Sequence, residues 1–301
     1  MVELKQIATE RRNEATANID TLSSCDMVRL INREDQKVAL AVERETEHIA
    51  AAIDLICEKM CGGGRLIYCG AGTSGRLGIL DAVECPPTYS TDPELVQGLI
   101  AGGMPAVFQA VEGAEDDPAL GREDLEAIHF GEKDVLVGIA ASGRTPYVLG
   151  AMRYARQKGG AVLAVTCCPG SEIDQLADVG IAPTPGPEVV TGSTRMKSGT
   201  AQKMVLNMLS TCTMIRLGKV YGNLMVDVKP SNEKLVQRCV SIVCTAAECT
   251  EAQARAALEQ CEYSAKTAIV MVRAGVNAAE AARRLEGAKG RVAAALGEIK
   301  S

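Results

Sequence analysis

The stretch that most constrains the fold is residues 65–84, RLIYCGAGTSGRLGILDAVE. It opens with the apolar run 66–69, which is typical of a buried strand, and it ends in a pattern with helical spacing. Between them lie three glycines: Gly70, Gly72 and Gly75. A strand, a glycine-rich turn and a helix point backbone N–H groups at one spot, so the segment predicts an anion site, usually for phosphate. The alternative is a tight turn in which Thr73 or Ser74 only caps the helix.

The glycine spacing also satisfies the dinucleotide pattern G-x-G-x-x-G, which is weak evidence when it stands alone. A nicotinamide enzyme also needs an acid at the end of the next strand to hold the ribose. The next candidate strand, residues 95–100, ends in Ala-Gly-Gly and offers no acid. The turn carries the hydroxyls of Thr73 and Ser74, which can bond a phosphate directly. We therefore favour a terminal phosphate monoester, and a dehydrogenase is the weakest interpretation.

Apolar runs and helical patterns alternate along the middle of the chain, which predicts an α/β fold with a parallel sheet between helices. The 301 residues, 47% of them hydrophobic, allow a sizeable core. We expect an N-terminal helical segment (1–55), an α/β domain (56–219) and a C-terminal helical region (220–301). Within the first segment, Glu34 and Asp35 are interpreted as a solvated helix start.

Three loops rich in hydroxyls are predicted at the carboxyl edge of this sheet, where ligands of α/β proteins bind. They contain Thr73-Ser74, Ser142 to Thr145, and Ser193-Thr194 with Lys197. One such loop is ordinary helix capping, but three on the ligand edge favour a phosphosugar site.

Two glutamates are candidates for acid–base chemistry. Glu84 is expected at the end of the first sheet helix, because Pro86-Pro87 should stop that helix. The negative end of the helix dipole disfavours a carboxylate there, which suits a general acid. Glu115 lies in the acidic loop 112–117, where crowded charges could poise a base. The alternative for both is an ordinary surface carboxylate.

Composition excludes several classes of function. The net charge is −6, and the chain has two Phe and no Trp, which argues against a nucleic-acid groove. No apolar stretch is long enough to span a bilayer, and the first residues lack a signal-peptide core, so a cytoplasmic protein is expected. The twelve cysteines form no C-x-x-C pair and there are two histidines, so we expect no metal site and reduced thiols.

Five motifs resemble a known family. They are GAGTSGRLGILDAVECPPTY, EGAED, GIAASGRTPYV, TGSTRMKSGTAQK and GNLMVDV. With the stretch INREDQKV, they are similar to the N-acetylmuramic acid 6-phosphate etherase family, within the sugar isomerase (SIS) group. The resemblance covers most of the chain and is least specific over residues 251–301.

The resemblance implies an SIS-type fold and lyase chemistry without a cofactor. Such enzymes cleave the D-lactyl ether of N-acetylmuramic acid (MurNAc) 6-phosphate to N-acetylglucosamine (GlcNAc) 6-phosphate and D-lactate, for reuse of cell-wall sugar. The family's acid–base glutamates fall on Glu84 and Glu115. Our hypothesis is that Glu84 is the acid to the departing lactate and Glu115 the base at C2, although these roles are open to exchange. Its phosphosugar contacts fall on Thr73, Ser74, Ser142, Gly143, Arg144, Thr145, Ser193, Thr194 and Lys197. It also implies a homodimer with sites near the subunit interface.

Two other functions remain open at this point. One is an SIS-fold isomerase that acts on another sugar phosphate. The other is a non-catalytic sensor such as the glucokinase regulatory protein, although a sensor need not keep both carboxylates.

Overall fold

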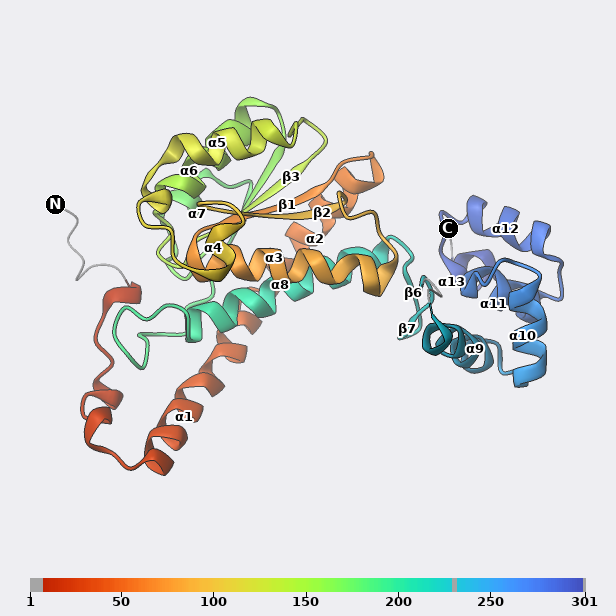
Figure 1. The fold of residues 1–301 in the computed structure, drawn as a ribbon, viewed down its shortest axis with the longest axis horizontal. Coiled ribbons are helices and arrows are strands. Elements are labelled where there is room, and N and C mark those ends of the chain that lie inside the picture. The colour runs from red at the N-terminus through yellow and green to blue at the C-terminus, as the bar shows by residue number, and fades with distance from the viewer. Residues whose placement is uncertain (1–7, 229–231, 300–301) are drawn as a thin grey trace. The chain divides into compact units, whose positions relative to one another are not determined.

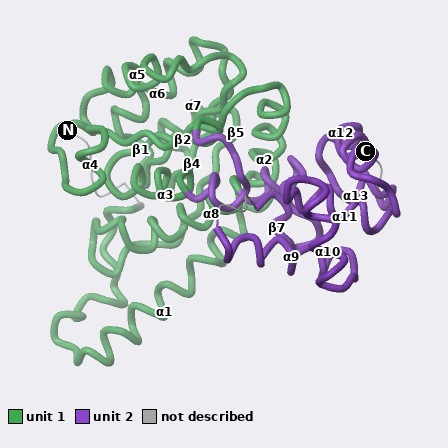
Figure 2. Tube along the Cα trace, turned by 45° about the vertical axis from the view of Figure 1, so that its right-hand side comes forward, with its two compact units in different colours: residues 1–83, 94–210 green, residues 84–93, 211–301 purple. Residues whose placement is uncertain are grey.

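The computed structural model describes residues 8–228 and 232–299, so the signal-peptide prediction concerns residues outside the described part. The chain divides into two compact units, residues 1–83 with 94–210 and residues 84–93 with 211–301 (Figure 2). Each is described by itself. The domain boundaries expected from the sequence remain predictions.

The first unit is built on a five-stranded sheet, which confirms the predicted α/β class. The strands are β1 (Leu66–Gly70), β2 (Val96–Ile100), β3 (Val135–Ile139), β4 (Ala161–Val165) and β5 (Val179–Ile181). Their order is β2-β1-β3-β4-β5 and every pairing is parallel. In β1, β3 and β4 every residue is buried, as expected for parallel strands covered on both faces.

Helices cover both faces of this sheet (Figure 1). The helices between residues 24 and 216 are α1 (Ser24–Glu43), which projects away from the sheet, α2 (Thr46–Cys61), α3 (Gly72–Tyr89), α4 (Pro105–Phe108), α5 (Pro118–Ala127), α6 (Pro146–Gln157), α7 (Glu172–Leu176) and α8 (Lys197–Arg216). Side chains alternate between the faces along each strand. Ile67 and Cys69 of β1 pack in the core with residues of α5 and α6. On the opposite face Tyr68 contacts Gly78 and donates to Asp81 of α3 (2.8 Å).

The N-terminal segment differs from its prediction in two ways. Short 3-10 turns, η2 (Ala8–Glu10), η3 (Glu14–Thr16) and η4 (Ile19–Thr21), lie before α1 in the segment that the sequence predicts to be helical. The interpretation of Glu34 as part of a solvated helix start is wrong. Glu34 lies inside α1 and is buried, because it pairs with a lysine that the sequence alone does not place beside it.

The expectation that Pro86-Pro87 stops the first sheet helix is also wrong, because α3 continues through both prolines to Tyr89. A proline removes one helical hydrogen bond, and a helix that ends within a turn of it loses little more. The N–H of Ser90 still donates to the carbonyl of Pro86 (2.9 Å). Glu84 therefore lies inside α3 and not at its end.

The second unit has its own core, formed by the hairpin of β6 (Val220–Tyr221) and β7 (Leu224–Met225) and by five helices. The helices are α9 (Glu233–Ala247), α10 (Glu251–Glu259), α11 (Ala265–Ala274), α12 (Ala278–Gly287) and α13 (Val292–Ala295). Asp227 forms ion pairs with Lys219 (2.9 Å) and Lys266 (2.8 Å) and accepts a hydrogen bond at its carbonyl from Ser90. The predicted helical C-terminal region is confirmed.

Candidate active site

The sheet order defines where a ligand should bind. The chain leaves β1 toward β2 at one edge and leaves β3 toward β4 on the other side, so a crevice opens beyond the carboxyl ends of β1 and β3. The loops that follow these two strands are the glycine-rich turn and the segment that contains Ser142. The topology therefore brings two of the three predicted hydroxyl loops to one place.

The glycines make the turn after β1 tight. A Cβ on Gly70 would lie 2.7 Å from the nitrogen of Gly75, and a Cβ on Gly75 would lie 2.6 Å from the carbonyl oxygen of Gly70. No larger residue fits at either position. The turn leads directly into α3, whose first N–H groups and positive dipole end favour an anion at this point.

A polar pocket of about 280 Å³ lies against this turn. Its lining residues come from the turn, the loop after β3, the acidic loop and two more distant segments. They are Thr9, Glu10, Ala71, Gly72, Thr73, Ser74, Glu115, Ile139, Ala140, Ala141, Ser142, Thr145 and Thr194. Six of the predicted site residues, Thr73, Ser74, Glu115, Ser142, Thr145 and Thr194, thus line one cavity.

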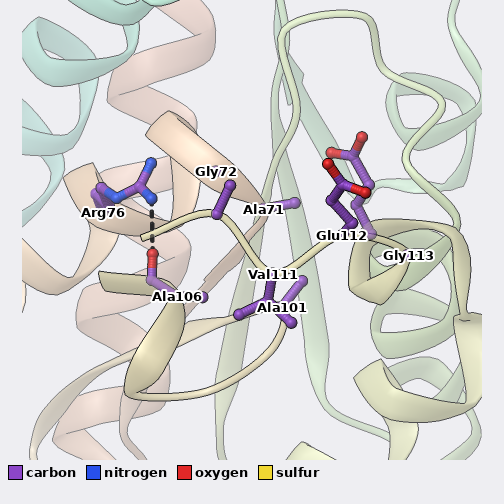
Figure 3. Close-up of a pocket in the computed structure, with 10 residues that line it drawn as sticks. Ala71, Gly72, Arg76, Ala101, Ala106, Val111, Glu112 and Gly113 are labelled. Atoms are coloured by element: carbon purple, nitrogen blue, oxygen red, sulfur yellow. Dashed lines mark hydrogen bonds between the residues drawn. The ribbon is translucent and has the colours of Figure 1, made fainter. Parts of the chain in front are cut away.

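A second pocket of about 190 Å³ shares Ala71, Gly72 and Glu115 with the first. Its other walls are mostly apolar: Ala101, Ala106, Ala110 and Val111, with Arg76, Glu112 and Gly113 (Figure 3). The guanidinium of Arg76 donates to the carbonyls of Val107 (2.9 Å) and Ala106 (2.7 Å). Arg76 therefore holds α4 in place and brings a positive charge to the wall of this pocket.

Glu115 lies on the short turn η5 (Ala114–Asp116), and it lines both pockets. Gly113 precedes it in the left-handed conformation (φ 78°) and Ala114 is buried beneath it. Asp117 caps α5 by accepting from the N–H of Ala119 (2.8 Å). The acidic loop is thus fixed at both ends, and its glutamate faces the cavities.

Ser74 is buried, and its hydroxyl donates to Oε1 of Gln202 on α8 (2.9 Å). The Nε2 of Gln202 is buried and has no hydrogen-bond partner among the described residues. If the amide turned over, Nε2 would donate to Ser74, and the Ser74 hydroxyl could then donate to a phosphate oxygen. Gln202 can therefore direct the hydroxyl of Ser74.

Lys197 lies in a different environment from Thr194, three residues before it. Lys197 is fully buried, and its ammonium donates to Oε2 of Glu34 (2.8 Å) and to the carbonyl of Pro185 (3.1 Å). Burial disfavours the Glu34 carboxylate, but hydrogen bonds from Lys197, Lys37 and Asn13 outweigh it and lower the pKa of Glu34 to about 2. Lys197 holds the loop in place and lines neither described pocket.

The carboxylate of Glu188 also fixes the loop that leads into α8. Glu188 is buried and accepts hydrogen bonds from the backbone N–H groups of Lys197 (2.9 Å) and Ser198 (2.9 Å) and from the Ser198 hydroxyl (2.8 Å). A carboxylate on the first N–H groups of α8 compensates its dipole. Buried polar contacts therefore hold the third hydroxyl loop, which carries Ser193 and Thr194.

Three more predicted contacts, Gly143, Arg144 and Ser193, are not among the lining residues of these two pockets. Gly143 has φ +69° and packs against Ser171, whose Oγ would lie 2.0 Å from a Cβ at this position. It therefore shapes the loop that carries Ser142. Arg144 is exposed.

Glu84 also lies outside the linings of these two pockets. It is exposed on α3, and the helix between residues 72 and 84 spans about 18 Å at about 1.5 Å per residue. The chain alone thus brings Glu115, but not Glu84, to the glycine-rich turn.

Sequence reasoning missed four residues of this region: Thr9, Glu10, Arg76 and Gln202. Thr9 and Glu10 lie more than fifty residues before the glycine-rich turn, and no pattern in the sequence joins them to it. Arg76 and Gln202 are in motifs that carried the resemblance, but their contacts cross between elements. Within the described ranges, no group of three or more His, Cys, Asp or Glu side chains could hold a metal ion. None of the described helices is long and apolar enough to cross a membrane.

Comparison with known proteins decides the family. An N-acetylmuramic acid 6-phosphate etherase from Photorhabdus laumondii is 61% identical over 93% of this chain and 93% of its own. Those from Aliivibrio fischeri strain MJ11 and Clostridium beijerinckii are 58% and 56% identical, over 94% and 98% of this chain and 95% and 97% of theirs. The chain belongs to the N-acetylmuramic acid 6-phosphate etherase family.

Domain models agree with this assignment. The SIS domain matches residues 121–211 of this etherase family member, the N-terminal SIS domain of glucokinase regulatory protein matches residues 48–156, and its C-terminal lid domain matches residues 222–282. A solved Bacteroides fragilis protein, proposed to be a phosphosugar isomerase involved in capsule formation, is 23% identical with a TM-score of 0.50, over 65% of this chain and 94% of its own. That similarity supports the fold alone.

Proposed function

We propose that this protein cleaves the D-lactyl ether of MurNAc 6-phosphate and releases D-lactate and GlcNAc 6-phosphate. The observation that carries the proposal is the position of Glu115, which lines both a hydroxyl-rich pocket and a second pocket whose wall combines alanines with Arg76 and Glu112. Relatives of up to 61% identity bear the name of this activity. An isomerase of another sugar phosphate would not need the second pocket.

The two pockets suit the two ends of this substrate. The phosphate belongs at the start of α3, where Thr73 and Ser74 and the helix dipole receive an anion. The lactyl group belongs in the second pocket, where alanines accept its methyl and Arg76 offers a charge to its carboxylate. The ether bond would then lie beside Glu115.

The chemistry that follows is an elimination and an addition. In the open-chain sugar, the C1 aldehyde acidifies the C2 proton, which Glu115 removes as base. The C3–O bond breaks, a C2–C3 double bond forms, and D-lactate leaves with the ether oxygen and a proton from a second acid. Water then adds its oxygen to C3, and a proton returns to C2. Each acid or base contributes a factor of about 10² to 10⁴ in rate.

We further propose that the acid is Glu84 of the partner subunit in a homodimer. Two observations support this assembly. Glu84 is exposed and lies three turns of helix from Gly72. The side chains of Leu80 and Val83, next to it on α3, are 48% and 57% exposed, and an interface would bury them.

The role in the cell follows from the substrate. MurNAc is a cell-wall sugar, so the activity would return its carbon to amino-sugar metabolism. No disulfide joins the described cysteines, which fits a reducing cytoplasm.

The activity is tested with MurNAc 6-phosphate in water labelled with ¹⁸O. We expect unlabelled D-lactate and GlcNAc 6-phosphate with ¹⁸O at C3, because the ether oxygen leaves with lactate. Labelled lactate would show direct attack on the lactyl carbon and contradict the mechanism. Isomerised sugar without lactate would favour the isomerase.

The subunit assignment is tested by mixing Glu84→Gln and Glu115→Gln proteins after reversible dissociation. If each site combines glutamates from two chains, a mixed dimer has one intact site, and about a quarter of the wild-type activity returns. If both glutamates act within one chain, mixing restores none.

A further inference from the structure

Thr9 and Glu10 line the polar pocket, although neither the sequence motifs nor the comparisons draw attention to them. Both lie on the turn η2, far from the glycine-rich turn in the chain. Thr9 is 4% exposed, and its hydroxyl is buried with no hydrogen-bond partner among the described residues. A buried hydroxyl without a partner costs free energy, and in a pocket wall it indicates a bond that a ligand completes.

The segment that carries Thr9 is anchored at the pocket by buried side chains. Nδ2 of Asn13 donates to Oε2 of Glu34 (3.0 Å) and to the carbonyl of Pro187 (3.2 Å). The hydroxyl of Thr16 donates to the carbonyl of Val189 (2.8 Å). These bonds tie the N-terminal turns to the loop that leads to Thr194, so the wall that Thr9 and Glu10 form is built into the fold.

Glu10 packs against the same loop. A Cβ on Gly192, which has φ +76°, would lie 3.2 Å from Oε2 of Glu10. The glycine therefore makes room for a carboxylate at the pocket wall. Because this loop also carries Thr194, Glu10 lies on the side of the pocket formed by the N-terminal turns and this loop.

The charge of Glu10 limits what it can bind. A carboxylate accepts hydrogen bonds and donates none, and it repels a phosphate or a lactyl carboxylate. Its partners in this pocket must be neutral donors, which on an amino sugar are ring hydroxyls and the acetamido N–H. A threonine hydroxyl can donate or accept, so it suits the same polar face.

We propose that Thr9 and Glu10 form the subsite for the uncharged polar face of the sugar, with Glu10 accepting from a sugar O–H or N–H and Thr9 bonding an adjacent polar group. The inference deepens the proposed function and rests on its substrate being a sugar phosphate. It makes this N-terminal turn a determinant of which sugar binds, separate from the groups that hold the phosphate.

Binding by calorimetry tests this subsite without any turnover. The probes are GlcNAc 6-phosphate, glucose 6-phosphate and inorganic phosphate, and the variants are Glu10→Gln and Thr9→Val. Loss of a hydrogen bond to a charged group lowers the affinity by a factor of about ten to a hundred. We expect Glu10→Gln to weaken the binding of GlcNAc 6-phosphate by that factor, while inorganic phosphate binds as tightly as before or more tightly, because a repelling charge is removed. Glu14→Gln is the matched control, because Glu14 is exposed on the next turn.

The comparison with glucose 6-phosphate identifies the donor. Equal losses for both sugar phosphates assign Glu10 to a donor at a position that both sugars carry, and a loss confined to GlcNAc 6-phosphate assigns it to the acetamido N–H. Equal losses for sugar phosphates and inorganic phosphate would overturn the proposal, as would unchanged binding of all three.

A thermal measurement separates binding from folding. Thr9→Val removes a buried hydroxyl that has no partner within residues 8–228 and 232–299. The Tm of the free protein should therefore stay the same or rise, while the increase in Tm on adding GlcNAc 6-phosphate becomes smaller. A fall in the free protein's Tm would assign Thr9 a structural role and contradict the subsite. If wild-type protein released no lactate, the proposed activity would fail, but these binding results would still decide the subsite.

Discussion

Two polar clusters meet in the loop that leads into α8, and they serve opposite purposes. One is the open cluster of Thr73, Ser74, Glu115, Ser142, Thr145 and Thr194, whose side chains line a cavity. The other is the sealed cluster of Glu34, Lys197, Asn13 and Glu188, whose side chains are buried and bonded to each other or to the backbone. Thr194 and Lys197 are three residues apart but belong to different clusters.

The comparison teaches that residue type alone does not reveal a binding role. A lysine among hydroxyls resembles a phosphate ligand, but here a glutamate from α1 neutralises it in the interior. The open cluster provides hydroxyls, backbone N–H groups and one carboxylate. The sealed cluster fixes the loops that present them. Changes in the first should alter function with little effect on stability, and changes in the second should do the reverse.

The largest expected effect is that of Glu115→Gln. This variant should lose about 10² to 10⁴ in kcat for lactate release, because the base at C2 is gone. Its Tm should stay near that of wild type, since the side chain is exposed. Asp116→Asn, one residue along the same loop and also exposed, is the control. Full activity in Glu115→Gln would remove this residue from the chemistry.

The sealed cluster is tested by Glu34→Gln. Removing one partner of a buried pair leaves the charge of Lys197 uncompensated and costs about 3–5 kcal/mol of stability. Urea unfolding measures this loss. The double variant Glu34→Gln/Lys197→Met should be more stable than Glu34→Gln alone, because no unpaired charge remains. If the single variant were as stable as wild type, the ion pair would not hold the loop.

The dependence of stability on acidic pH tests the same ion pair. The pKa of Glu34 falls from 4.5 to about 2 in the folded protein, so its contribution is fully present above pH 4.5 and is lost as the pH falls through 2. Wild type should therefore lose stability over this range more steeply than Glu34→Gln. Parallel curves would contradict the lowered pKa.

A smaller effect should come from Gln202, which bonds the hydroxyl of Ser74 in the open cluster. In Gln202→Glu the carboxylate cannot donate, so it holds the Ser74 hydroxyl as a donor to itself and keeps it from phosphate. We expect about a tenfold rise in KM with kcat largely unchanged, because phosphate is held equally before and during the reaction. Gln202→Met, which leaves Ser74 free to donate, should show a smaller rise. Equal KM values in the two variants would exclude this coupling.

Much of the open cluster could be predicted because it follows strands. Glycines and hydroxyls directly after β1 and β3 must lie at the carboxyl edge of a parallel sheet. The sequence therefore predicts Thr73, Ser74, Ser142 and Thr145 at this edge, and all four line one cavity. The acidic loop was found by its charge. Such inferences depend on neighbours in the chain.

The sealed cluster could not be predicted, because its partners are distant in the sequence. The pair of Glu34 with Lys197 joins α1 to the start of α8, and the bond of Asn13 to Pro187 joins the N-terminal turns to the same region. Local rules also misplace the end of α3. The helix continues past both prolines to Tyr89, so Glu84 lies inside it and not at its end.

Exchange of the C2 hydrogen with solvent shows whether Glu115 is the base that removes this proton. GlcNAc 6-phosphate is incubated in D₂O with wild type, Glu115→Gln and Glu84→Gln, and deuterium at C2 is followed by NMR. We expect exchange at C2 with wild type, exchange at a reduced rate with Glu84→Gln, and a near-complete loss of exchange with Glu115→Gln. Normal exchange with Glu115→Gln, together with its loss in Glu84→Gln, would contradict the assignment of Glu115 as the base.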